Sequence, residues 1–174
     1  TRKNLEIDTN SQGQSDHTLC ELMDQTTTAM GSRLLRRWLK QPLQNRNKLN
    51  QRLNSIGTLI DQGVIFDLQE HFKRIGDIER ITTRISMLSE RPRDLVTLSN
   101  SLKQVQIIKA ELASITDNEI VDLNSHLYLH NSVIERIDQA IIENPPVITR
   151  DGGMIADGYD EELDELRNIS TDAG

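Results

Sequence analysis

The segment TTAMGSRLLRRWLKQP, residues 27–42, carries the pattern that decides the fold class. Its apolar residues recur at intervals of about one helical turn and share one face, which comprises Met30, Leu34, Leu35, Trp38 and Leu39. A second face carries four cations, Arg33, Arg36, Arg37 and Lys40. Pro42 ends the segment because it disfavours helical backbone in the residue before it. The segment therefore predicts an amphipathic helix with one apolar and one basic face.

The same helical periodicity continues over most of the chain. Residues 45–61 repeat it through Leu49, Leu53, Ile56 and Ile60. Gly63 and Gly76 are expected to separate this helix from the next two, and Asp77 to cap the second of them. Pro92 suits the first turn of a long helix that extends to Leu112. Asp117 is expected to open another helix, which continues through His126 and His130 to Ile141.

Residues 145–166, PPVITRDGGMIADGYDEELDEL, interrupt the helical pattern. Two prolines come first, and β-prone residues then surround an Asp-Gly-Gly turn. The strands are expected at residues 147–149 and 154–156, and Asp160 is expected to cap an acidic final helix. The sequence therefore predicts an irregular all-α, multi-helix domain with one small β-hairpin near residues 147–156.

Length and composition indicate a folded, water-soluble chain. It has 174 residues, of which 36% are hydrophobic and 27% charged, whereas only 3% are aromatic, so leucine and isoleucine are expected to fill the core. Neither a signal peptide nor an apolar run of about 20 residues is visible, so we expect no membrane partner. The single Cys20 indicates a reducing compartment, and we expect a cytoplasmic location.

Charge is distributed unevenly along the chain. The net charge is −7, but residues 1–110 hold 17 Lys and Arg against 12 Asp and Glu, and residues 111–174 hold 3 against 15. A nucleic-acid-binding domain is usually more basic. The face with Arg33, Arg36, Arg37 and Lys40 could still bind phosphates; the alternatives are a solvated face or ion pairs with a neighbouring element.

Patterns typical of metal sites and enzymes are incomplete. His126 and His130 have the i, i+4 spacing of two metal ligands on one helix, but two ligands fall short of the usual three or four. The carboxylates of residues 157–165 lack the order of a calcium loop and fit the first turn of a helix. The sequence shows neither a GxxxxGK[ST] phosphate loop nor a GxSxG elbow. We therefore predict no catalytic, metal or cofactor-binding residue in this chain.

Several blocks, taken together, resemble a known family. The order and the amino-acid sequences of these blocks are similar to those of the bacterial DNA mismatch-recognition protein family MutS. The similarity is to the first segment of its core or lever domain, domain III. The blocks are TRKNLEI (1–7), TTAMGSRLLRRWLKQPL (27–43), IGDIERITTRI (75–85), RPRDL (91–95) and PPVITRDGGMIADGYDEELDEL (145–166).

The resemblance implies an organisation. Residues 1–158 would be a segment of the helical core, and residues 159–174 the base of an ascending lever helix, cut before the DNA clamp. Apolar faces built to meet a returning chain segment would then be exposed. The family's Phe-x-Glu mismatch-reading motif and its nucleotide-binding loop are absent from this sequence.

The resemblance also implies a role, that of a structural and allosteric segment that couples an ATPase to mismatch-binding and clamp regions. The alternative is a helical module that itself binds nucleic acid through its basic face. Six cations are expected at contacts between domains: Arg33, Arg36, Arg37, Lys40, Arg91 and Arg93. The intact protein would use ATP and magnesium, and its partners would be its own other domains, mismatched duplex DNA, a MutL-like protein and a second subunit. It would be bacterial and cytoplasmic, and nucleoid-associated when acting.

Overall fold

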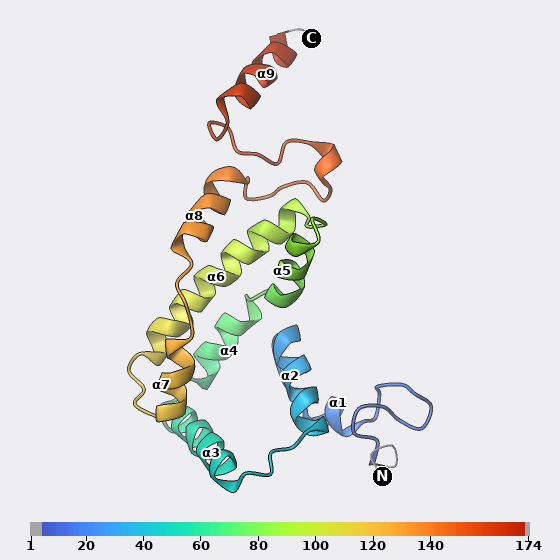
Figure 1. Cartoon of the computed structure of the whole chain (residues 1–174), viewed down its shortest axis with the longest axis vertical. Coiled ribbons are helices and arrows are strands. Elements are labelled where there is room, and N and C mark those ends of the chain that lie inside the picture. The colour runs from blue at the N-terminus through green and yellow to red at the C-terminus, as the bar shows by residue number, and fades with distance from the viewer. Residues whose placement is uncertain (1–4, 173–174) are drawn as a thin grey trace.

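The structure, a computed structural model, describes residues 5–172, and it confirms the all-α fold class. Helices account for the regular structure of this part of the chain, and they follow one another along an elongated molecule (Figure 1). The helices are α1 (Leu19–Met23), α2 (Ala29–Lys40), α3 (Arg46–Asp61), α4 (Ile65–Lys73), α5 (Ile78–Ser86), α6 (Pro92–Leu112), α7 (Asn118–Ser125), α8 (Asn131–Ala140), the short 3-10 helix η2 (Thr149–Asp151) and α9 (Glu161–Asp172).

The long helix α6 organises the packing. Helices α4, α5, α7 and α8 all pack against it, whereas α3 packs on α7 and α1 packs on α2. Figure 1 shows the consequence: α6 runs along the middle of the molecule, with α3 beyond one of its ends and α9 beyond the other. The basic face of α2 and helix α9 therefore have different neighbours in the molecule.

The predicted caps at Asp77 and Asp117 do begin helices, and Thr28 is a further cap that was not predicted. The Thr28 hydroxyl accepts a hydrogen bond from the Gly31 amide at 3.0 Å and opens α2. Asp77 accepts from the Arg80 amide and opens α5, and Asp117 accepts from two amides and opens α7. Pro92 stands in the first turn of α6, where its missing amide hydrogen leaves no bond unmade.

The core is small and aliphatic. Its buried apolar side chains come from α1, α4, α5, α6, α7, α8 and the loop after α6. They are Cys20, Leu68, Ile81, Leu98, Ile108, Ile115, Ile120 and Ile134. Two serines of α6, Ser99 and Ser101, are also fully buried and use their hydroxyls in hydrogen bonds to Asp138 and to the Thr97 carbonyl. These small side chains let neighbouring elements approach α6 closely.

The predicted hairpin is wrong, although its second half does pair. Residues 149–151 form the 3-10 helix η2, and Gly152 and Gly153 both have positive φ values. Ile155 pairs instead with Ile141, just after α8, in an isolated antiparallel bridge. Two prolines lie between the bridge and η2, and a proline has no amide hydrogen to donate to a ladder. The β element therefore joins the end of α8 to the approach to α9.

The single helix predicted from Asp117 to Ile141 is also wrong, because it is broken in two. Helix α7 ends at Ser125 and α8 begins at Asn131. His126 is the residue that follows α7, and His130 the residue that precedes α8. The two histidines therefore do not share a helical face, and the spacing expected of two metal ligands is not realised.

Helices α2 and α3 leave much of their apolar faces open to solvent. Leu34 and Trp38 of α2 are 42% and 41% exposed, and the predicted inner residues of α3 are as exposed or more so. The Arg52 guanidinium lies 3.6 Å from the centre of the Trp38 ring and joins α3 to α2. The only buried residue of α3 is Ser55, which faces α7.

Candidate functional site

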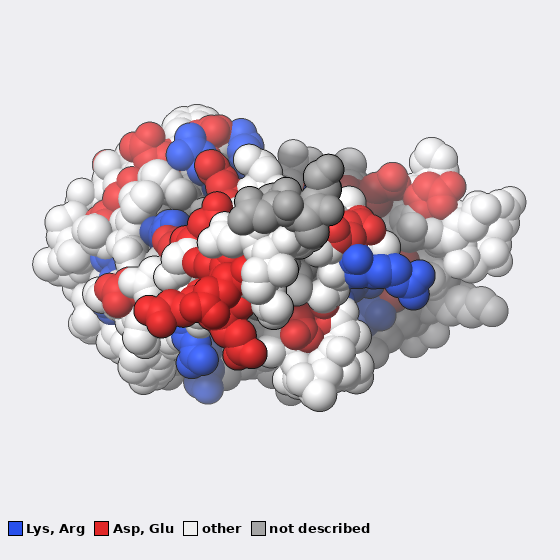
Figure 2. Space-filling model, turned by 90° about the horizontal axis from the view of Figure 1, so that it is seen from above, with Lys and Arg blue, Asp and Glu red and all other residues white. Residues whose placement is uncertain are grey.

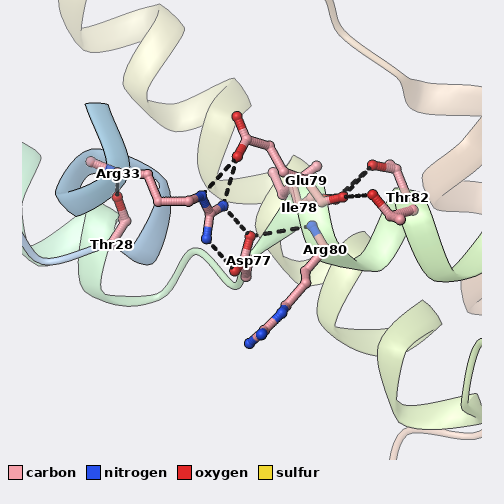
Figure 3. Close-up of polar contacts among 9 residues, drawn as sticks. Thr28, Arg33, Asp77, Ile78, Glu79, Arg80 and Thr82 are labelled. Atoms are coloured by element: carbon pink, nitrogen blue, oxygen red, sulfur yellow. Dashed lines mark hydrogen bonds and ion pairs between the residues drawn. The ribbon is translucent and has the colours of Figure 1, made fainter. Parts of the chain in front are cut away.

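The basic face of α2 is joined to the start of α5 by Arg33. Its guanidinium donates two parallel hydrogen bonds to the Asp77 carboxylate, at 2.9 and 2.7 Å. It also donates to Glu79, at 3.1 and 2.7 Å, so that Arg33 bridges both carboxylates (Figure 3). A two-bond fork fixes the orientation of the partners as well as their separation. This contact therefore sets how α2 meets α5.

Asp77 has two functions at this junction. Its Oδ1 atom also accepts the Arg80 amide hydrogen and caps α5. The hydrogen bonds from Arg33 lower the pKa of Asp77 below its usual range and outweigh the opposing effect of burial. Asp77 is therefore ionised at neutral pH, as both the cap and the fork require.

The other end of α5 is joined to α6 in the same manner. Arg84 donates from Nε and Nη2 to the two oxygens of Asp94, at 2.8 and 2.6 Å. The Asp94 carboxylate also accepts the amide hydrogen of Arg91 and thereby completes the start of α6. The pKa of Asp94 is lowered, chiefly by the hydrogen bonds from Arg84. Helix α5 is thus held by arginine–carboxylate forks at both ends.

Two further arginines continue the connection towards α9. Arg93, at the start of α6, donates to the carbonyl oxygen of the buried Pro145 at 3.0 Å. Arg167 of α9 donates to the Ile155 carbonyl at 2.9 Å and to Asp157 at 2.7 Å. We call the contacts of Arg33, Arg84, Arg93 and Arg167 the arginine series. Arg33 and Arg84 join α2 to α5 and α5 to α6, whereas Arg93 and Arg167 attach α6 and α9 to the segment between α8 and α9.

Polar side chains tie the remaining helices to α6. The ring of His71, on α4, lies 3.0 Å from Gln104 Oε1 and 2.9 Å from Glu111 Oε1. Both partner atoms accept hydrogen bonds, so the doubly protonated ring suits both. The hydrogen bond to Gln104, with Glu111, raises the pKa of His71. On the opposite side, Asp138 of α8 accepts from Ser99 at 2.6 Å and from Lys103 at 2.7 Å.

The residues predicted to contact other domains occupy three kinds of position. Arg33 and Lys40 form ion pairs within the chain, and Lys40 lies 2.6 Å from Asp8. This outcome matches the alternative in which the face is paired with a neighbouring element. Arg91 and Arg93 stand at the start of α6, where the Arg91 amide and the Arg93 side chain are both used internally.

The other two members of the basic face, Arg36 and Arg37, are exposed. Arg36 borders an open hollow whose walls include Glu21 and Asp24. Two carboxylates beside Arg36 disfavour a phosphate at this position. The part of the basic face that is not engaged in ion pairs within the chain is thus smaller than the sequence pattern predicts.

The carboxylate partners were not predicted as site residues. Asp77 and Asp94 each carried a signal, because both stand where a helix begins and were identified as caps or as part of the RPRDL block. Nothing in the sequence indicates that Arg33 would reach Asp77 across 44 positions. Long-range pairing of this kind depends on how α2 packs, which the local pattern does not specify.

In the described part of the chain, side chains suited to metal binding are not grouped. Within residues 5–172, no cluster of three or more His, Cys, Asp or Glu side chains could hold a metal ion. His126, the residue after α7, contacts the carbonyl oxygen of Asp122 in that helix. Also in this part of the chain, none of the helices has the length and apolarity required to cross a membrane.

The fold and its contacts define a class: a helical structural module whose charged side chains join helices to one another. The chain matches the family model described as MutS domain III over residues 1–172. Since the match covers nearly all of the sequence, the chain belongs to the MutS domain III family. Domain III is a non-catalytic helical domain of MutS, and this membership supports a role in MutS-type DNA mismatch repair.

Proposed function

We propose that this chain is the structural and allosteric core segment of a MutS-like mismatch-recognition ATPase. In this role it couples the ATPase to the mismatch-binding and clamp regions. The observation that carries the proposal is the arginine series, which joins α2 to α5 and α5 to α6, and attaches both α6 and α9 to the segment between α8 and α9. A displacement of α2 would be passed to α5 and α6 as a rigid-body movement.

The physical basis is the directionality of the forks. A single ion pair between exposed side chains tolerates rotation, whereas two parallel hydrogen bonds to one carboxylate resist it. Arg33 holds Asp77, the residue that caps α5, and Arg84 holds the first turn of α6. Helix α5 therefore cannot turn about its axis without breaking one of the two forks.

The domain organisation follows from the same proposal. Residues 1–158 form the segment of the core, and residues 159–174 form the base of the ascending lever. Helix α9 lies within the second part and is attached to the first through Arg167 and the Ile155 carbonyl. Movement of the lever would thus act on the bridge between Ile155 and Ile141.

The intact protein supplies the partners. We propose that six exposed cations face other domains of the same chain: Arg33, Arg36, Arg37 and Lys40 on α2, and Arg91 and Arg93 at the start of α6. Mismatched duplex DNA, a MutL-like protein and a second subunit would bind elsewhere in the intact protein, which would use ATP and magnesium in the cytoplasm and at the nucleoid. The internal pairing of Arg33 and Lys40 favours this function over direct nucleic-acid binding by the basic face.

The test measures coupling in the intact protein. The affinity for mismatched duplex is determined with and without ATP, and the ratio of the two dissociation constants is the coupling factor. We expect Arg84→Gln and Asp94→Asn each to reduce this factor by roughly twofold to thirtyfold. Arg136→Gln, on the exposed surface of α8, is the matched control and should leave it unchanged.

Two results would be decisive. If the double variant reduces coupling no more than either single variant, the two residues act through their mutual contact. If both single variants are folded and keep the wild-type coupling factor, the arginine series does not transmit the nucleotide state.

A further inference from the structure

We propose that Asp151 is a site of spontaneous backbone modification, at which the chain forms a succinimide and then an isoaspartyl residue. Asp151 and Gly152 are both exposed, in the segment that joins α8 to α9. Figure 1 shows the turn at η2 on the outer edge of the molecule. The chain itself supplies the nucleophile, the amide nitrogen of Gly152, and water is the other reactant. The modification therefore does not depend on the proposed coupling role.

Aspartate followed by glycine is the sequence best suited to this reaction. The amide nitrogen of the next residue must approach the carboxyl carbon of the aspartate, and a Cβ atom on that residue obstructs the approach. Figure 2, which looks onto the α9 end of the molecule, shows many carboxylates there. The sequence contains only two Asp-Gly bonds, Asp151-Gly152 and Asp157-Gly158, and it contains no Asn-Gly bond. The structure distinguishes between these two candidates.

The reaction balances without an oxidant or a cofactor. The Gly152 nitrogen bonds to the Cγ atom of Asp151, and a Cγ–O bond breaks. The oxygen leaves as water with the carboxyl hydrogen and the amide hydrogen. One water molecule then opens the succinimide ring. Addition of water at Cγ restores Asp151, whereas addition at the main-chain carbonyl carbon leaves the chain joined through Cβ and Cγ, as isoaspartate.

Hydrogen bonds hold both reacting groups of the Asp157 site. The Gly158 amide donates to the carboxylate of Asp164 at 2.7 Å, and Arg167 donates to the carboxylate of Asp157 at 2.7 Å. A hydrogen bond to a carboxylate is roughly twice as strong as one between neutral groups. The contact with Arg167 directs the Asp157 carboxylate towards α9. Asp157 is therefore protected although its side chain is 94% exposed.

Asp151 lacks this protection. Within residues 5–172, its carboxylate has neither a hydrogen bond nor an ion pair. The Gly152 amide donates to the neutral carbonyl of Thr149 at 3.1 Å, in a 3-10 helix of only three residues. So short a 3-10 helix on the surface opens at a low cost in free energy. Once it opens, the amide of Gly152 is free to approach the carboxyl group.

The product would change the backbone beside the bridge between Ile141 and Ile155. An isoaspartyl residue adds one atom to the main chain at position 151. The bridge begins three positions later, where the Met154 carbonyl accepts from Ile142 at 3.0 Å. The Ala156 amide donates to the carbonyl of Ala140 at 2.9 Å in the same bridge. A longer and redirected chain at residue 151 would therefore weaken these two hydrogen bonds.

Water enriched in heavy oxygen measures the reaction. Each passage through the succinimide ring incorporates one heavy oxygen atom, and tandem mass spectrometry assigns the atom to Asp151 or to Asp157. The purified chain is incubated under native conditions and, in parallel, in concentrated urea. In the folded chain, we expect Asp151 to gain the label roughly five times faster than Asp157, or more. In urea the two rates should become similar because both aspartates precede glycine.

Three variants test the cause of the difference. Asp164→Ala removes the acceptor of the Gly158 amide and should raise the labelling of Asp157 towards that of Asp151. Glu165→Ala is the matched control, because it removes a neighbouring exposed carboxylate of α9 and should leave the labelling unchanged. Circular dichroism verifies that α9 is retained in both. Asp151→Glu should abolish labelling at position 151, because the longer side chain would have to close a larger and less favourable ring.

Equal labelling of Asp151 and Asp157 in the folded chain, or faster labelling of Asp157, would overturn the proposal. So would labelling of Asp151 that does not exceed that of Asp61, which glycine does not follow. A ratio that urea leaves unchanged would overturn protection by the fold. In the isomerised chain, separated by chromatography, the amide hydrogens of Ile142 and Ala156 should exchange faster than in the unmodified chain. Unchanged exchange would overturn the effect on the bridge.

Discussion

Arg84 and Asp94 stand ten positions apart and join α5 to α6 through two hydrogen bonds of 2.8 and 2.6 Å. The same carboxylate accepts the Arg91 amide hydrogen, so one side chain both starts α6 and orients α5. Its exposed fraction is only 16%, which places the pair in partial shelter from water. Loss of this carboxylate therefore affects two helices at once.

Asp94→Asn should destabilise the chain by about 1–2 kcal/mol, because the amide can still accept from a backbone donor but no longer carries the charge that binds Arg84. Urea denaturation followed by circular dichroism measures this as a lower midpoint at unchanged slope. Asp61→Asn, at an exposed position on α3, is the control and should change little. A midpoint equal to that of the wild type would show that the fork contributes no net stability.

Acid should unfold the chain partly through Asp77 and Asp94. Arg33 lowers the pKa of Asp77 and Arg84 lowers that of Asp94, so both carboxylates stabilise the folded state when ionised. Their contribution is fully present above the unfolded pKa of about 3.9 and is lost as pH falls through the lower folded values. Stability measured against pH should thus decline below about pH 4. The double variant Asp77→Asn/Asp94→Asn should show a shallower decline.

His71 should give the opposite dependence near neutral pH. Its pKa is raised by Gln104 and Glu111 against the effects of burial and of Arg74, so the charged ring stabilises the packing of α4 on α6. This contribution is complete below the unfolded pKa of about 6.5 and is lost as pH rises through the folded value. The thermal midpoint should fall across this range in the wild type.

The matching variants are His71→Gln, in which the fall should disappear, and His126→Gln, in which it should remain. His126 is exposed, lies at the end of α7 and has no hydrogen bond to Glu111 among the contacts of the described residues. An undiminished fall in His71→Gln would assign the titration to another group.

Gly76 and Gly57 should respond oppositely to alanine. A Cβ atom at Gly76 would lie 2.4 Å from the Cγ2 atom of Thr97, so Gly76→Ala forces α5 and α6 apart and should cost about 1–3 kcal/mol. Gly57, inside α3, has open space around it, and Gly57→Ala should stabilise the chain by about 0.5–1 kcal/mol. The denaturant midpoints of the two variants, compared with that of the wild type, test both predicted changes in stability. Equal effects of the same sign would show that the close approach at Gly76 is relieved without cost.

The chain alone should not bind duplex DNA. Arg33 and Lys40 are paired internally, and Arg36 has carboxylates beside it. Titration of a labelled duplex at about 50 mM salt is a stringent test because phosphate contacts are strongest at low salt. Binding that Arg36→Glu/Arg37→Glu abolishes would instead support the alternative, a nucleic-acid-binding face. Binding unaffected by that change would place the contact elsewhere.

Much of the helical organisation could be predicted from the sequence because capping is local. Thr28, Asp77 and Asp117 each accept a hydrogen bond from a backbone amide within three positions. The side chain that starts the helix is therefore adjacent to that helix in the sequence. Pro92 acts through its own backbone. The apolar periodicity then identifies which residues share a face.

The predictions that failed depend on contacts over longer distances. The break between α7 and α8 lies in a segment without Gly or Pro, so no residue marks it in the sequence, and both helices pack on α6. Met154, Ile155 and Ala156 pair with residues 140–142 rather than with residues 147–149, which are closer in sequence. Periodicity correctly identified the apolar face of α3 but not that the face would lie open to solvent.

The candidate site was predicted only in part for the same reason. The arginine face of α2 is visible in the sequence, and so is the cap at Asp77, whereas Asp94 is visible only as part of the RPRDL block. That Arg33 pairs with one cap and Arg84 with the other follows from the arrangement of three helices. The relative positions of these three helices could not be predicted from the sequence.

The attachment of every neighbouring helix to α6 has a consequence for the dynamics of the chain. Helices α4, α5, α7 and α8 share this one support, whereas α1 and α2 pack on each other and meet the remainder largely through side-chain tips. Backbone amides of α6 should exchange with deuterium last, and those of α1 and α2 much sooner, as one cooperative unit. The N-terminal pair would then be able to detach and re-dock while the rest of the molecule stays folded.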